Sequence, residues 1–311
     1  MAFITSLLNS MPGAISQGMI WGILAIGVYI TFKILDISDL TVDGSLCTGA
    51  ATCIVLIMLD VPTYIALIAS FIVGLLAGFV TGLFHTAFGI PAILSGILTQ
   101  LALYSVNLHI MGWDQATFSR ANLPINADKY NLALSSRYLR TFSLQNPLLV
   151  LVICIVVLIA ILYWFFGTEI GSSLRATGAN ENMARANGIN TNRAKVLALM
   201  ISNGLIALSG GLLAQYQGFA DINMGRGAIV IGLAAVIIGE VLFSKIFKNF
   251  ALKLLSCVFG AIIYYVVIQI VLKLGLSTDD LKLLSAIVVS LFLAVPYWKS
   301  NYASKHVKKE A

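Results

Sequence analysis

Charged side chains are scarce in this chain. Asp, Glu, Lys and Arg make up 10% of the 311 residues, whereas 59% are hydrophobic and the mean hydropathy is +0.95. A soluble domain carries about 25% charged residues. The apolar runs extend over roughly 20 residues, the length a helix needs to cross about 30 Å of hydrocarbon, whereas a closed β-barrel would show short alternating strands. The composition therefore excludes an ordinary soluble domain and predicts an all-α polytopic membrane protein, a single transmembrane domain over residues 1–311.

The residues that catalysis and metal binding require are also few. The four cysteines form no close pair and the three histidines are scattered, so we interpret the cysteines as packing residues. No Gly-Lys dipeptide occurs, which excludes a P-loop for ATP. We find no Ser-His-Asp set and no pair of carboxylates. We therefore expect a non-enzymatic protein with no catalytic residue, no metal ligand and no bound cofactor. Any energy-requiring step that it performs must then be driven by a partner protein or by an ion gradient.

The net charge of +6 does not indicate nucleic-acid binding, because the Lys and Arg residues lie in loops and in the tail. Residues 1–10 contain no Lys or Arg, so we expect no cleavable signal peptide. We interpret residues 1–13 as a short interfacial segment before the first span.

The apolar runs predict nine membrane-embedded helices, with a range of 8–10. They cover residues 14–35, 46–59, 64–84, 92–110, 147–166, 196–217, 225–243, 252–274 and 281–298. The third carries Gly74, Gly78 and Gly82 at four-residue intervals, a spacing that allows close contact between helices in lipid. The long segment 111–146 is expected to form its own small structure on the outer side, and 299–311 is a basic tail.

The second run is short, and polar residues precede it. Asp36, Asp39 and Asp43 lead into small and hydroxylated residues. One interpretation is a discontinuous helix whose polar N-terminal part enters the membrane against protein. The other is a plain cytoplasmic turn with Asp43 or Ser45 as the N-cap.

The fourth run is the most polar of the nine. Gln100, Tyr104 and Asn107 fall on one face at helical spacing. Amide side chains are costly in lipid, so this face is predicted either to line a cavity or to form hydrogen bonds between helices. Glu240 falls near the end of the seventh run, close in sequence to two lysines. We interpret it as an interfacial carboxylate that snorkels or forms an ion pair, in preference to a buried catalytic carboxylate.

A polar island at residues 169–195 interrupts the apolar runs. Asn180 is a good N-cap, Glu181 suits a first turn, and Gly188 can end a helix in the left-handed conformation. Asn180, Met183, Ala184 and Asn187 would share one face. Such a helix either docks into a groove of a soluble partner or lies at the interface without one.

The letters of the island, LRATGANENMARANGI, resemble the cytoplasmic coupling segment of ABC importer permeases of the branched-chain amino acid and ribose family. LTVDGS at 40–45, SGGLLAQYQG at 209–218 and GLAAVIIGE at 232–240 resemble the same family. The resemblance covers roughly residues 14–298. It implies a type II-like importer permease whose coupling segment, 169–193, docks into an ATP-binding subunit. The positions that match for this role are Leu174, Arg175, Ala176, Gly178, Asn180, Ala184, Gly188 and Ile189.

The resemblance further implies two ABC ATPase subunits that bind ATP and Mg, an extracytoplasmic substrate-binding protein, and a second copy of the chain enclosing the path at a dimer interface. LTVDGS looks most like a subgroup associated with amino acid uptake, including aromatic amino acids. The residues we expect along the path are Thr41, Asp43, Ser45, Thr99, Gln100, Asn107 and Asn203. The alternative function is an ion-coupled secondary transporter, which would need acidic or basic residues inside the membrane.

The orientation follows from the distribution of positive charge. With the island in the cytoplasm of a bacterial cell, nine spans place 12 of the 19 Lys and Arg residues inside and 7 outside the inner membrane. The N-terminus is then outside and the C-terminus cytoplasmic.

Overall fold

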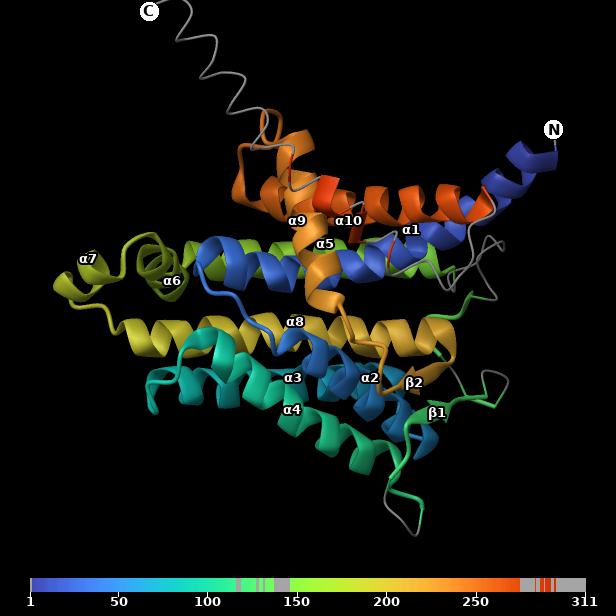
Figure 1. Ribbon diagram of the computed structural model, residues 1–311, viewed down its shortest axis with the longest axis horizontal. Coiled ribbons are helices and arrows are strands. Elements are labelled where there is room, and N and C mark those ends of the chain that lie inside the picture. The colour runs from blue at the N-terminus through green and yellow to red at the C-terminus, as the bar shows by residue number, and fades with distance from the viewer. Residues whose placement is uncertain are drawn as a thin grey trace, which may run out of the picture.

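A computed structural model describes residues 2–115, 119–126, 129–130, 132–136 and 146–274, together with isolated residues between 283 and 294. Its helices form an elongated bundle, with two short strands at one end and two short helices at the other (Figure 1). The elements are α1 (Ala2–Tyr29), the π-helix η1 (Ile30–Ile34), α2 (Val42–Met58), α3 (Thr63–Thr86), α4 (Ala92–Met111), β1 (Asn122–Pro124), α5 (Pro147–Gly167), α6 (Glu169–Ala179), α7 (Glu181–Ala186), α8 (Thr191–Gln217), β2 (Phe219–Asp221), α9 (Ala228–Phe243) and α10 (Phe250–Lys273).

Six helices of the described residues are long and apolar enough to cross a membrane: α1, α3, α4, α5, α8 and α10. Two shorter apolar helices, α2 and α9, occupy the predicted second and seventh runs. The predicted ninth run, 281–298, lies outside the continuously described residues. Helix α1 begins at Ala2 and passes through Pro12 without a break, so the helix extends about a dozen residues further toward the N-terminus than the predicted first run.

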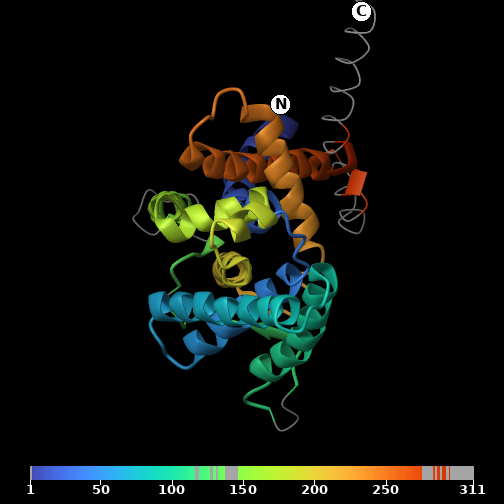
Figure 2. The ribbon, with the colours of Figure 1, turned by 90° about the vertical axis from the view of Figure 1, so that its left-hand side faces the viewer.

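Helix α8 lies at the centre and packs against α1, α2 and α3. Figure 2, which looks along the bundle, shows α8 between a layer with α1 and α10 and a layer with α3 and α4. Gly74 and Gly78 of α3 lie against the α8 backbone at Asn203 and Leu199. An added Cβ would collide with either carbonyl, so these glycines allow the close approach that their spacing predicted.

The opposite layer also uses glycine at its contacts. Gly18 and Gly22 of α1 lie against the α10 backbone at Ile262 and Val258. Gly239 of α9 lies against Ser256 of α10. The layers meet where Gly27 of α1 lies against the Ser202 carbonyl oxygen of α8, 2.9 Å from the position of an added Cβ.

Helix α2 begins inside the bundle. The chain leaves η1 at one end, runs inward without regular structure, and starts α2 well within the bundle (Figure 1). Asp39 and Thr41, at this entry, are 2% and 0% exposed. These two polar residues therefore lie against protein, as the discontinuous-helix interpretation predicted, and a plain cytoplasmic turn does not account for their burial.

The described part of segment 111–146 packs at the other end of the bundle. Strand β1 pairs antiparallel with β2, with Leu123 opposite Ala220. Leu123 and Leu134 are fully buried. The described part of this segment therefore contributes one strand to a sheet that β2 completes, and packs on the bundle; it does not form a separate structure by itself.

Candidate functional site

The polar island forms two short helices, α6 and α7, at one end of the bundle (Figure 1). The Asn180 side chain accepts a hydrogen bond of 3.0 Å from the Met183 amide and caps α7. Gly188 follows α7 with φ +81°, in the left-handed region. Both predicted ends are confirmed.

Helix α6, which precedes α7, was missed. Thr168 is its N-cap and accepts from the Gly171 amide at 3.3 Å, with Glu169 in the first turn. A Thr followed by Glu is the signal that could have revealed it.

Four of the eight coupling positions attach the island to the bundle: Leu174, Arg175, Gly178 and Ala184. Leu174 and Ala184 are fully buried. Gly178 lies against the Ile34 carbonyl of η1, where an added Cβ would collide. Ala184 therefore does not belong to an outward face, whereas Met183, which is 53% exposed, does. Ala176 and Ile189 are half-buried.

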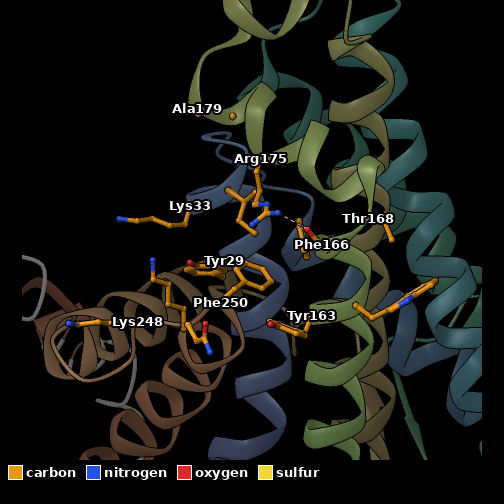
Figure 3. Close-up of a pocket in the computed structure, with 15 residues that line it drawn as sticks. Tyr29, Lys33, Tyr163, Phe166, Thr168, Arg175, Ala179, Lys248 and Phe250 are labelled. Atoms are coloured by element: carbon orange, nitrogen blue, oxygen red, sulfur yellow. Dashed lines mark hydrogen bonds between the residues drawn. The ribbon is translucent and has the colours of Figure 1, made fainter. Parts of the chain in front are cut away.

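Arg175 joins α6 to two membrane helices. Its guanidinium donates to the Phe166 carbonyl of α5 at 2.7 Å (Figure 3) and lies 6.0 Å from the centre of the Phe250 ring of α10. Hydrogen bonds and ring contacts of this kind fix an arginine in place. Displacing α6 would therefore pull on α5 and α10.

Glu181 joins α7 to the start of α8. Its carboxylate lies 2.8 Å from the Lys195 ammonium, accepts from Arg185 at 2.6 Å and accepts from Thr191 at 3.2 Å. The Lys195 hydrogen bond, with the charges of Lys195 and Arg185, holds the pKa of Glu181 below its usual range. The island is thus tied to η1, α5, α8 and α10, so a force on it reaches the bundle at several points.

Four of the seven predicted path residues meet in a buried polar network. Asn203 of α8 donates to Asp39 at 2.6 Å, and Ser45 of α2 donates to Asn203 at 2.6 Å. Thr41 and Thr99 are each hydrogen-bonded to Thr81 of α3, at 2.7 and 2.9 Å. Thr41, Ser45, Thr99 and Asn203 therefore face one another where α2, α3, α4 and α8 meet.

The other three path residues, Asp43, Gln100 and Asn107, line a cavity of about 170 Å³ between α2, α4 and the turn before α9. Tyr104 and Arg226 also line it. Asn107 is 1% exposed and donates to the Gly44 carbonyl at 3.4 Å, while its own Oδ1 has no partner among the described residues. The polar face of α4 thus forms a contact between helices and also lines a cavity.

Asp43 caps a helix distant in sequence. Its carboxylate accepts from the Gly227 amide at 3.0 Å and from the Ile229 amide at 3.1 Å, at the start of α9. The predicted role as N-cap of its own helix is wrong, because Thr41 holds that position and Asp43 lies in the first turn. A carboxylate at a helix N-terminus is stabilised by the free amides and by the helix dipole.

Glu240 forms an ion pair with Lys33 of η1 at 2.9 Å, and both side chains are 46% exposed. The pairing is therefore confirmed and the carboxylate is not buried, although the partner is not one of its neighbours in sequence; its place at the membrane interface stays a prediction. In the described part of the chain, His, Cys, Asp and Glu form no group of three that could hold a metal ion.

Comparisons with known proteins relate the whole chain to transport proteins. The family model for the permease component of branched-chain amino acid transport systems matches residues 10–296. The chain is 40% identical over 288 residues to a tyrosine transport system permease protein of Clostridioides difficile, covering 91% of each chain. An uncharacterized protein of Rickettsia prowazekii is 35% identical, over 92% of this chain and 98% of its own length.

More distant similarities are weaker. The ribose import permease protein RbsC of Escherichia coli is 24% identical over 203 residues, 65% of this chain and 60% of its own. Among solved structures, PsaBC from Streptococcus pneumoniae in complex with Fab aligns with a TM-score of 0.42 and 16% identity, over 86% of this chain and 95% of its own.

Proposed function

The chain belongs to the family of permease components of branched-chain amino acid transport systems, and from that premise we propose that it is the transmembrane permease subunit of an ATP-driven amino acid importer. The family places it among multi-pass membrane proteins of ABC transport systems, whose permeases work with ATPase and substrate-binding partners. Two copies of the chain form the proposed transporter, with the path between them. Two partner ATPases bind the ATP and Mg.

The observation that carries this proposal is the attachment of the island to the bundle. Helices α6 and α7 protrude at one end, with Met183 53% and Ile170 54% exposed for contact with a partner. Behind them, Arg175, Gly178 and Glu181 make the contacts with membrane helices described above. An ATPase that moves this surface would move the helices attached to it.

The cavity supports an amino acid as the substrate class. It brings one carboxylate, Asp43, and one guanidinium, Arg226, together with the amides of Gln100 and Asn107. An amino acid carries both signs of charge, and the unpartnered Oδ1 of Asn107 can accept from its ammonium group. Tyr104 is 44% exposed beside the cavity, which fits a second copy of the chain completing the site. The tyrosine transport permease among the relatives agrees with this class.

The orientation proposed here is that of the inner membrane of a bacterium, with α6 and α7 in the cytoplasm. The N-terminal end of α1 lies at the opposite end of the bundle, with β1 and β2 (Figure 1). This arrangement fits an N-terminus outside; the cytoplasmic C-terminus stays a prediction from the sequence, because it lies outside the described residues.

A secondary transporter is the second candidate, because Asp39 is a carboxylate that is 2% exposed within the bundle. Carboxylates buried in membrane bundles mark proton and ion pathways. The Asp39 carboxylate, however, already accepts from Asn203 and from the Thr41 amide, at 2.9 Å for the latter, so it has the partners of a structural residue.

Affinity purification of the full chain from its native membrane distinguishes the two candidates. We expect a P-loop ATPase to co-purify in equal amount and ATP to drive uptake in proteoliposomes. A chain that purifies alone, shows no ATPase crosslinked near Arg185, and transports with an ion gradient would contradict the importer.

A further inference from the structure

A large basic cavity lies beside the coupling segment. Its volume is about 960 Å³, within the range of about 300–1,000 Å³ typical of ligand sites. Lys33 of η1, Arg175 of α6, Lys248 before α10 and Lys253 in α10 all line it. Figure 3 shows Lys33, Arg175 and Lys248 coming from three separate segments around the rings of Tyr29 and Phe250.

The charge of this cavity is strongly one-sided. None of its 15 lining residues, all in the described part of the chain, is acidic. Glu240, which is not among the lining residues, forms an ion pair with Lys33 at 2.9 Å. Helix α10 also begins here, and the Asn249 side chain makes no capping hydrogen bond with its first turn. The free amides of a helix N-terminus attract anions, so the backbone adds to the effect of the cations.

The same cavity adjoins a surface suited to lipid. Ile153, Val157, Ile161 and Trp164 share one face of α5 at helical spacing and are 56%, 50%, 55% and 72% exposed. Trp164 also lines the cavity, next to Tyr163, which is 52% exposed. Trp and Tyr concentrate at the boundary between hydrocarbon and headgroups. Cations and interfacial aromatic residues therefore share the lining of the cavity, and Trp164 belongs both to this lining and to the apolar face of α5.

We propose that this cavity binds the phosphate headgroup of an anionic phospholipid, with its acyl chains against the exposed face of α5. The phosphate accepts from Lys248 and Lys253 and faces the first turn of α10. Arg175 keeps its bond to the Phe166 carbonyl and contributes charge. Basic pockets between membrane helices near a headgroup layer are suited to such lipids. Because the cavity touches both α6 and α10, a bound lipid would join the coupling segment to the membrane helices.

The test uses the full chain purified in detergent and titrated with phosphatidylglycerol, with binding measured by native mass spectrometry. The Lys248→Gln/Lys253→Gln double variant should bind about 25-fold more weakly, because each lysine near an anionic headgroup contributes about fivefold to the affinity. The control is Lys245→Gln/Arg193→Gln, which removes two exposed cations from the same end of the molecule but outside the cavity. Both variants should elute as the native chain does in gel filtration.

An equal loss of phosphatidylglycerol affinity in the test and control variants would mean that the total positive charge, and not this cavity, sets the affinity. That result would overturn the proposal. Phosphatidylcholine should bind at least tenfold more weakly than phosphatidylglycerol because its headgroup has no net charge. Glycerol 1-phosphate tests for a soluble ligand with the same phosphate chemistry. If it binds as tightly as the lipid, the acyl chains contribute nothing and the assignment to a lipid is wrong.

Discussion

Gly188 sets the end of α7 through its backbone, not through a contact. Its φ is +81°, and an added Cβ would meet nothing within 4 Å. Asn107, in contrast, is proposed to act through its side chain, whose Oδ1 has no hydrogen-bond partner among the described residues. The two residues therefore call for different substitutions, one that changes conformation and one that changes chemistry.

Replacing Gly188 by Val should strain the end of α7 by about 1–3 kcal/mol, because β-branched residues avoid the left-handed region. We expect faster amide exchange over residues 181–190 and a higher ratio of ATP hydrolysed to substrate transported. Gly167→Val is the control, since Gly167 also has open space around it but does not have a positive φ. Gly188→Asn should restore most of the coupling, because Asn enters this region readily. Unchanged coupling in Gly188→Val would argue against a docking role.

Replacing Asn107 by Leu should weaken substrate binding about tenfold or more, the value of a hydrogen bond to a charged group. Uptake at several substrate concentrations measures it, and the ATPase should still co-purify. Ser105→Leu, at an exposed position of the same helix outside the cavity, should leave uptake unchanged. Loss of ATPase co-purification in Asn107→Leu would instead assign Asn107 to the fold.

Whole elements depend on contacts that local sequence does not reveal. The N-cap at Asn180 and the left-handed end at Gly188 involve neighbours within a few residues, so the sequence predicts them. Asp43, in contrast, caps α9 from 184 residues away, and Asn203 meets Asp39 across 164 residues. A single sequence shows that these side chains are polar and near apolar runs. It does not show which of them bond to one another and which line a cavity.

The α9 cap predicts a graded loss of stability at position 43. Asp43→Ala removes both acceptors and should cost about 1–2 kcal/mol, as loss of an N-cap does. Asp43→Asn retains one side-chain oxygen and should cost less. Thermal unfolding of the purified chain in detergent measures both, independently of transport. Equal destabilisation by the two variants would assign the effect to the lost charge.

At the scale of the whole molecule, hydropathy was sufficient for the fold class and for eight of the predicted runs, because lipid requires long apolar helices. Hydropathy did not locate the start of α1 at Ala2, since residues 2–13 are only moderately apolar. The proposed orientation of the bundle in the membrane rests on the distribution of Lys and Arg residues, and on the position of α6 and α7 at the end opposite the start of α1.

A cysteine at position 185 tests that direction. In a Cys154→Ala background, Arg185→Cys should react with a membrane-impermeant maleimide only from the cytoplasmic side; the remaining native cysteines are buried. Ala121→Cys, exposed beside β1 at the other end, should react only from outside. The reverse pattern would invert the proposed topology.

The glycine contacts have a mechanical consequence. Where backbones touch with no side chain between them, helices cannot slide without collision, so α3 moves with α8, and α1 and α9 move with α10. The helices therefore form two groups, α3 with α8, and α1 and α9 with α10, each of which should move as a unit. The two groups meet where Gly27 of α1 lies against the Ser202 carbonyl of α8, a contact of the same kind, so sliding of α1 along α8 is restricted there as well.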